Sequence, residues 1–137
     1  MDHLIHIQFA ADTAMAMLIW LVQLVIYPAF RVVDRDSFHD WHRNYMKTFS
    51  RIVIPIMLLQ ALCHGLLAVL HPSVMQWISS VAVLGAWAAT VTLSVPCHQR
   101  LQTSGFQPDV VTRLIKTNWV RSFLWSLPFL SGIVQSQ

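Results

Sequence analysis

The sequence predicts an all-α integral membrane protein, a four-helix bundle with both chain termini outside the cytoplasm. Three observations predict it: sparse charge, four long apolar stretches, and basic residues confined to two segments. Of the 137 residues, 55% are hydrophobic and 11% are charged, whereas soluble domains carry about 25% charged residues. We therefore expect one membrane-spanning domain over residues 1–137.

Four stretches are long enough to cross the membrane, because a bilayer core of about 30 Å needs about 20 apolar residues in a helix. We expect spans at about residues 4–30, 52–70, 74–96 and 119–134. Only residues 71–73 separate the second span from the third, so these spans should form an antiparallel hairpin in which Ser73 begins the third helix. The first stretch has no basic residues before it and no small-residue cleavage motif after it, which favours a retained span over a signal peptide.

The basic residues indicate the orientation. They all lie between spans one and two, between spans three and four, or just inside span four: Arg31, Arg35, Arg43, Lys47, Arg51, Arg100, Arg113, Lys116 and Arg121. Basic residues concentrate on the cytoplasmic side of membrane proteins, so the termini and the 71–73 turn are expected outside. The net charge of +3 then reflects contact with anionic lipid head groups and does not indicate nucleic-acid binding.

Helices two and four should extend beyond the bilayer into the cytoplasm. The second is predicted to run from Phe38, after a Ser37 N-cap, to Leu70, which makes it about 50 Å long at 1.5 Å per residue. The fourth should begin at Pro108 and continue into its span. Together these extensions would form a helical cap that is rich in histidine.

Each predicted span carries one stripe of polar residues. Polar groups inside a membrane must be satisfied internally, so such stripes mark the faces that point into a bundle. Asp12 and His64 should lie at a similar depth, about 10 Å below the outer boundary. We expect them to pair, with Gln60 as a third member, and they are our candidate catalytic residues for proton handling. The alternative is a packing role, with Asp12 protonated or bonded to a nearby Ser or Thr.

A second polar group is expected at the cytoplasmic end. His42 and His98 should approach each other with Tyr45 beside them, while Asn118 and Arg121 enter from the fourth helix. Histidines near such residues form a ligand-binding or acid–base arrangement, so all five are candidate cofactor-binding residues. His42 and His98 are also the candidate metal ligands. Haem or a transition metal fits this set, although the sequence identifies no cofactor. The two polar groups lie about 33 Å apart along the second helix, so they cannot share one metal ion.

Three junctions between spans and loops carry distinctive motifs. Their sequences are Tyr27-Pro28-Ala29-Phe30, Val95-Pro96-Cys97-His98-Gln99-Arg100-Leu101 and Thr117-Asn118-Trp119-Val120-Arg121. In these motifs the chain resembles the small four-helix bacterial membrane proteins of the anthrone-oxygenase-like domain-of-unknown-function group, which more often have asparagine where His98 stands. In layout alone it is similar to the haem-binding bacterial protoporphyrinogen oxidases. Both resemblances imply oxidation of flat aromatic substrates.

These features favour a membrane-embedded, oxidoreductase-like protein that binds a flat hydrophobic substrate, or a haem, metal or quinone-type cofactor, within the bundle. The sequence leaves open whether the protein is an enzyme. The alternative is a small transport or assembly subunit whose polar stripes seat a partner helix or relay protons; either could act as a homodimer or with a partner membrane subunit. A third reading is metal handling by the seven histidines and six methionines, although the methionines lack thioether-cluster spacing.

Overall fold

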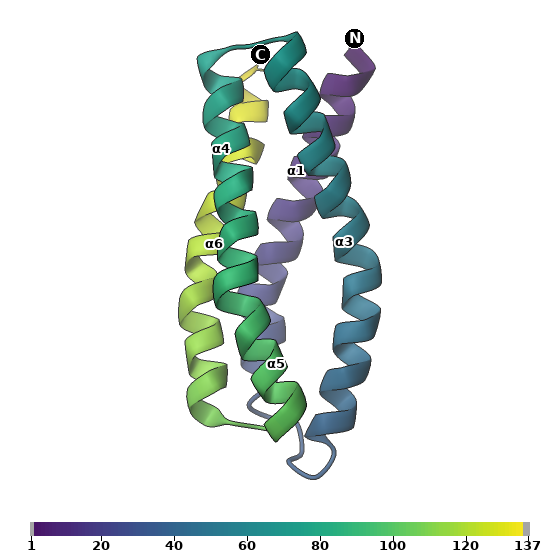
Figure 1. Ribbon diagram of the computed structural model, residues 1–137, viewed down its shortest axis with the longest axis vertical. Coiled ribbons are helices and arrows are strands. Elements are labelled where there is room, and N and C mark those ends of the chain that lie inside the picture. Colours follow the sequence, from purple (N-terminus) through teal and green to yellow (C-terminus); the bar gives the residue numbers. More distant parts are fainter. Residues whose placement is uncertain (1, 136–137) are drawn as a thin grey trace.

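The computed structural model describes residues 2–135 and places all the helices in four columns (Figure 1). The first two columns are α1 (Asp2–Leu21) with the π-helix η1 (Val22–Ile26) and α2 (Tyr27–Ala29), and then α3 (Phe38–Leu70). The other two are α4 (Val74–Ala89) with the π-helix η2 (Thr90–Ser94) and α5 (Val95–Ser104), and then α6 (Pro108–Gln135). The all-α prediction is confirmed.

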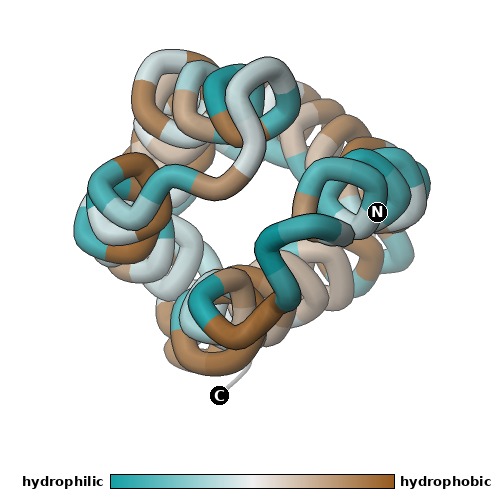
Figure 2. The backbone as a smooth tube through the Cα atoms, turned by 90° about the horizontal axis from the view of Figure 1, so that it is seen from below, coloured by the Kyte–Doolittle hydropathy of each residue, from teal (hydrophilic) through white to brown (hydrophobic). Residues whose placement is uncertain are grey.

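The four columns surround a common axis, as the end-on view in Figure 2 shows. Both α1 and α4 pack against α3 and α6, whereas no close backbone contacts join the diagonal pairs α1 with α4 or α3 with α6 within residues 2–135. The start of α1, the end of α6 and the α3–α4 turn lie at one end, and the α2–α3 and α5–α6 connections lie at the other (Figure 1). We call these the upper and the lower end. The predicted hairpin of the second and third helices is confirmed.

Polar and special residues define the helix ends. The Ser73 side chain accepts a hydrogen bond from the Gln76 backbone N–H at 3.0 Å, so it caps α4 as predicted. Ser37 does precede α3, but its hydroxyl bonds to Asp34 and not to the helix. Gly105 ends α5 with a φ of 71°, a conformation that glycine adopts without steric cost.

The long second and fourth helices begin at Phe38 and Pro108, as predicted. The third column is longer than predicted, because α5 continues to Ser104 instead of ending near residue 96. Pro96 has no N–H for an intrahelical bond, and the helix accommodates it by widening into η2, in which the Val95 N–H bonds to the Thr90 carbonyl. The lower end is therefore built from three extended helices rather than two.

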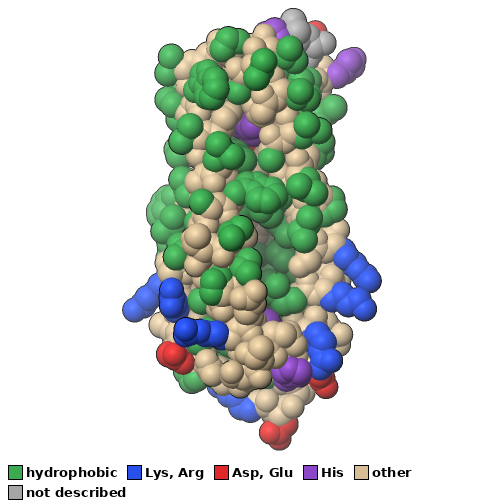
Figure 3. Space-filling model, in the orientation of Figure 1, with side chains coloured by type: hydrophobic (Ala, Val, Ile, Leu, Met, Phe, Trp, Pro, Cys, Tyr) green, Lys and Arg blue, Asp and Glu red, His purple; other side chains and the backbone are tan. Residues whose placement is uncertain are grey.

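The surface separates charged from apolar side chains. Figure 3 shows the visible Lys and Arg side chains gathered toward the lower end, with mostly hydrophobic side chains above them. Each column exposes large apolar residues, for example Leu24, Leu62, Leu84 and Phe123, all about 60% exposed. Soluble proteins rarely expose such extensive apolar surface. Three columns, Asp2–Ala29, Phe38–Leu70 and Val74–Ser104, are long and apolar enough to cross a membrane, and α6 falls short of that measure.

Candidate functional site

Every column contributes buried polar side chains to the interior, and these form two hydrogen-bonded networks. The upper network comprises Gln8, Asp12, Gln60, His64, Gln76 and Ser80. The lower network comprises Gln23, Tyr27, His42, Ser94, His98, Gln102, Asn118 and Arg121. All the residues predicted as candidate site residues except Tyr45 belong to one of the two.

The predicted contact between Asp12 and His64 is confirmed. His64 Nε2 lies 3.0 Å from Asp12 Oδ1, and Gln60 Nε2 donates to the same oxygen at 2.7 Å. Asp12 and Gln60 have no exposed surface, and His64 is 2% exposed. The geometry therefore holds the carboxylate against an imidazole and an amide, while the catalytic role of the pair stays a prediction.

Residues of α4 position the other side of the His64 ring. His64 Nδ1 lies 3.3 Å from both Ser80 Oγ and Gln76 Nε2. The Ser80 hydroxyl donates to the Gln76 carbonyl at 2.8 Å, and the Gln76 amide pairs with that of Gln8 at 3.3 Å. Gln76 was not predicted as a member of this network. It lies one helical turn before Ser80 and therefore on the same face of α4.

The lower network contains an unbranched chain of hydrogen bonds. Tyr27 Oη lies 3.1 Å from His98 Nε2, His98 Nδ1 lies 3.0 Å from His42 Nε2, and His42 Nδ1 lies 3.2 Å from Gln102 Oε1. The amide oxygen of Gln102 can only accept, so His42 Nδ1 carries a hydrogen and its Nε2 accepts one from His98. His98 Nε2 then accepts from the Tyr27 hydroxyl. The donors all point from Tyr27 toward Gln102, which adjoins the exposed His39.

Arg121 lies at the inner end of this chain without a negatively charged partner. Its Nη1 donates to Ser94 Oγ at 2.7 Å, Asn118 Oδ1 at 2.9 Å and Tyr27 Oη at 3.3 Å, all of them uncharged groups. Arg121 is 8% exposed, and no carboxylate forms an ion pair with it among residues 2–135. Burial of an uncompensated guanidinium is unfavourable. The position therefore favours any group that brings negative charge density beside it.

The two π-helices place residues of the lower network. Both precede a proline, Pro28 or Pro96, that cannot donate a backbone hydrogen bond. A π turn inserts one extra residue and rotates the chain that follows it, and such turns are frequent at functional sites. Tyr27 follows η1 directly, while Ser94 closes η2 and His98 lies one turn beyond it. Sequence periodicity assumes regular α-helix, so it did not reveal this rotation.

Tyr45 faces a groove on the side of the bundle. Its ring stacks between Trp41 and Phe49, with centroid distances of 5.8 Å and 5.3 Å, and lies 6.4 Å from the His98 ring. The groove has a volume of about 520 Å³ and an almost wholly apolar lining, which also includes Val25, Ile26, Ala29, Asn44, Thr48 and Ile52. Within the described part of the chain, the Tyr45 hydroxyl makes no hydrogen bond. It is a polar group available on an apolar wall.

The histidines do not form an evident metal centre. All four ring nitrogens of His42 and His98 are within hydrogen-bonding distance of Gln102, of Tyr27 or of each other. Among residues 2–135, no group of three or more His, Cys, Asp or Glu side chains could hold a metal ion. Since structural and catalytic metal sites use three or four protein ligands, a metal or haem iron at these rings would have to displace the observed bonds. We derive no chemistry through such a group.

Trp125 joins the two networks. Its Nε1 donates to Gln60 Oε1 at 2.9 Å, and its ring lies 5.3 Å from the Arg121 Cζ atom. This contact of Trp125 with α3, across the bundle, could not be predicted from the sequence. An indole N–H donates and does not accept, so protons cannot pass through this link.

Replacing Trp125 with Phe should destabilise the protein by about 1–3 kcal/mol, because the buried Gln60 oxygen loses its donor. Unfolding of the detergent-solubilised protein by heat or denaturant measures this effect. Trp119→Phe is the matched control, since Trp119 is 40% exposed. Equal destabilisation by the two substitutions would contradict a structural role for the Trp125–Gln60 bond.

Comparison of the chain with protein-family models, with curated proteins and with solved structures found no match. The resemblance to the anthrone-oxygenase-like group stays a prediction. The function has to be argued from the two networks, the groove and the surface.

Proposed function

We propose that the protein crosses the bacterial inner membrane four times, with its upper end outside and its lower end in the cytoplasm. The fourth span is supported by the outer face of α6, where Val120, Phe123 and Leu130 are 48%, 62% and 53% exposed. The polar residues that lower the hydropathy of α6 include Asn118 and Arg121, which are buried and face the interior. The basic residues at the lower end support the orientation.

Cysteine labelling in whole cells tests this orientation. In a background with Cys63 and Cys97 replaced by Ala, His3→Cys should react with a membrane-impermeant maleimide added outside. Asp36→Cys should react only after the membrane is permeabilised, because it lies in the α2–α3 connection at the other end. Labelling of Asp36→Cys in intact cells would contradict the orientation.

For the activity, we propose a membrane-embedded, oxidoreductase-like protein that binds a flat hydrophobic ligand in the side groove. It would exchange protons with that ligand through the lower network. The observation that carries this proposal is the Tyr27–His98–His42–Gln102 chain, which lies beside Tyr45 at the groove and leads to the exposed lower end.

The groove suits a ligand that arrives from the lipid phase. Its apolar lining lies on the side of the bundle, between the first column and α3, at the level where the expected span meets the cytoplasmic membrane interface. Trp41 and Phe49 offer aromatic contacts for a flat ring system. The Tyr45 hydroxyl can bond to a hydroxyl or carbonyl oxygen on that ligand, which fixes its orientation.

The chain behind Tyr45 suits proton transfer. The Tyr45 ring lies 6.2 Å from that of His42 and 6.4 Å from that of His98. Because every donor points toward Gln102, a proton taken up by the Tyr27 oxygen would move the Tyr27 hydrogen to His98 Nε2 and the His98 Nδ1 hydrogen to His42 Nε2. The nearby positive charge of Arg121 disfavours a charged His98 and so favours onward transfer to His42. Oxidation of the ligand would further require an external electron acceptor.

Binding of 1-naphthol, with naphthalene as the ligand control, tests the groove. The purified protein should bind naphthol more tightly, and Tyr45→Phe should remove that preference by a factor of about 3–10, the value of one hydrogen bond. Quenching of tryptophan fluorescence measures binding, and Trp41→Phe shows how much of the signal comes from the groove. Unchanged preference in Tyr45→Phe would contradict the role of Tyr45.

The alternative, a small subunit that relays protons, is favoured by one observation: the two networks together extend from Gln8 near the upper end to Gln102 near the lower end. The two networks are linked through Trp125, whose ring contacts Arg121 without a hydrogen bond. Proton flux into liposomes that hold the protein and a pH-sensitive dye distinguishes the two functions. We expect no flux above that of empty liposomes, and a flux that Asp12→Asn or His98→Ala abolishes would favour the relay.

A further inference from the structure

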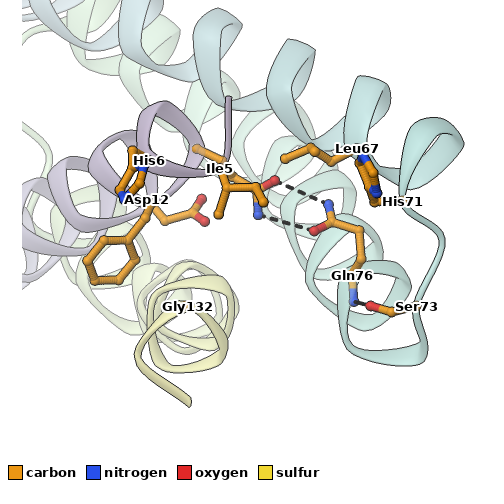
Figure 4. A pocket seen from close by; sticks show the side chains of 10 residues that line it. Ile5, His6, Asp12, Leu67, His71, Ser73, Gln76 and Gly132 are labelled. Carbon is orange, nitrogen blue, oxygen red and sulfur yellow. Dashed lines mark hydrogen bonds between the residues drawn. The ribbon is translucent and has the colours of Figure 1, made fainter. Parts of the chain in front are cut away.

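A cavity at the upper end of the bundle has no part in the proposed function. Its volume is about 300 Å³, and it lies among α1, α3, α4 and α6 near the α3–α4 turn (Figure 4). Its walls combine apolar and polar side chains, chiefly Ile5, Gln8, Phe9, Asp12, Leu67 and Gln76. The side groove lies between the first column and the lower half of α3, so the two sites can be tested separately.

Asp12 supplies this cavity with an unpartnered carboxylate oxygen. Its side chain is 1% exposed, and both of its hydrogen bonds go to Oδ1. Within the described residues Oδ2 is buried and has no hydrogen-bond partner. Figure 4 shows the carboxylate pointing into the space between the helices. A buried carboxylate oxygen without a donor is unfavourable, and a ligand that donates to it would relieve that cost.

The partners of Asp12 include no Lys or Arg side chain. The Gln76 amide nitrogen lies 3.3 Å from His64 Nδ1 and can donate to it, which leaves His64 Nε2 to donate to Asp12 Oδ1. The other donor to Asp12 Oδ1 is the Gln60 amide. His6 and His71 also line the cavity, and its lining contains no Lys or Arg.

We propose that this cavity binds a small primary alkylammonium ion, with the ammonium group on Asp12 Oδ2 and the alkyl chain against Ile5, Phe9 and Leu67. The amide oxygens of Gln8 and Gln76 offer further acceptors for the ammonium hydrogens. The Phe9 ring can contribute a cation–π contact. A bare alkali ion would gain nothing from the apolar walls, and the volume lies at the small end of the range for ligand pockets.

Isothermal titration calorimetry of the full-length protein in detergent tests the proposal. The probe is n-butylammonium chloride at constant ionic strength, and 1-butanol is its uncharged analogue. We expect butylammonium to bind at least 10-fold more tightly than butanol, because only the cation neutralises Asp12. Asp12→Asn should weaken butylammonium binding at least 10-fold. The exposed Asp36→Asn, which removes an acid at the opposite end, should leave it unchanged.

A second variant keeps the test decisive if Asp12→Asn fails to fold. Ile5 is 50% exposed, so Ile5→Trp can partly fill the cavity without disturbing the core or removing the carboxylate. It should weaken butylammonium binding at least 10-fold. The proposal is overturned if butanol binds as tightly as butylammonium, if either Asp12→Asn or Ile5→Trp binds like the wild type, or if potassium or sodium chloride displaces the probe at equal concentration.

Discussion

The bundle depends on hydrogen bonds that join polar side chains of one column to those of another. Its diagonal helices make no close backbone contacts within residues 2–135, so side chains have to fill the centre. Hydrogen bonds that cross it join Trp125 of α6 to Gln60 of α3, Tyr27 of α2 to His98 of α5, and Gln8 of α1 to Gln76 of α4. Away from bulk water, each such group is costly unless it is paired. The polar residues thus fix both the packing and the chemistry.

Two prolines couple the backbone to the lower network. Pro28 and Pro96 each follow a π-helix, and they lie in the first and third columns. The rotation at these turns aims Tyr27 and His98 at each other across the diagonal, where regular α-helix would direct them elsewhere. The same turn lets the third column continue to Ser104, so that Gln102 can receive the hydrogen bond from His42. The π turns beside the two prolines and the geometry of the lower network are therefore linked.

The positions of residues that depend on the regular rise of an α-helix could be predicted from the sequence. Positions that depend on π turns could not. The distances of Asp12 and His64 from the outer ends of their spans placed them at one level, and counting turns from residues 71–73 brought His42 toward His98. Both predictions use the constant rise of the α-helix. The length of α5 and the role of Tyr27 depended on π turns that no hydrophobic period reveals. Gln76 and Gln102 were missed for another reason: glutamine amides are common on polar faces and have no spacing that marks them as network members.

Arg121 and Asp12 show why the interior is more than packing. They carry opposite charges. Within residues 2–135, Arg121 has no charged side chain within ion-pairing distance, and Asp12 has only His64. Trp125 and Gln60 lie between them, contacting Arg121 and Asp12 respectively. A bundle selected for stability alone would gain by pairing the two charges or by replacing both with apolar residues. Keeping them apart leaves Arg121 beside Tyr27 in the lower network and Asp12 toward the upper cavity.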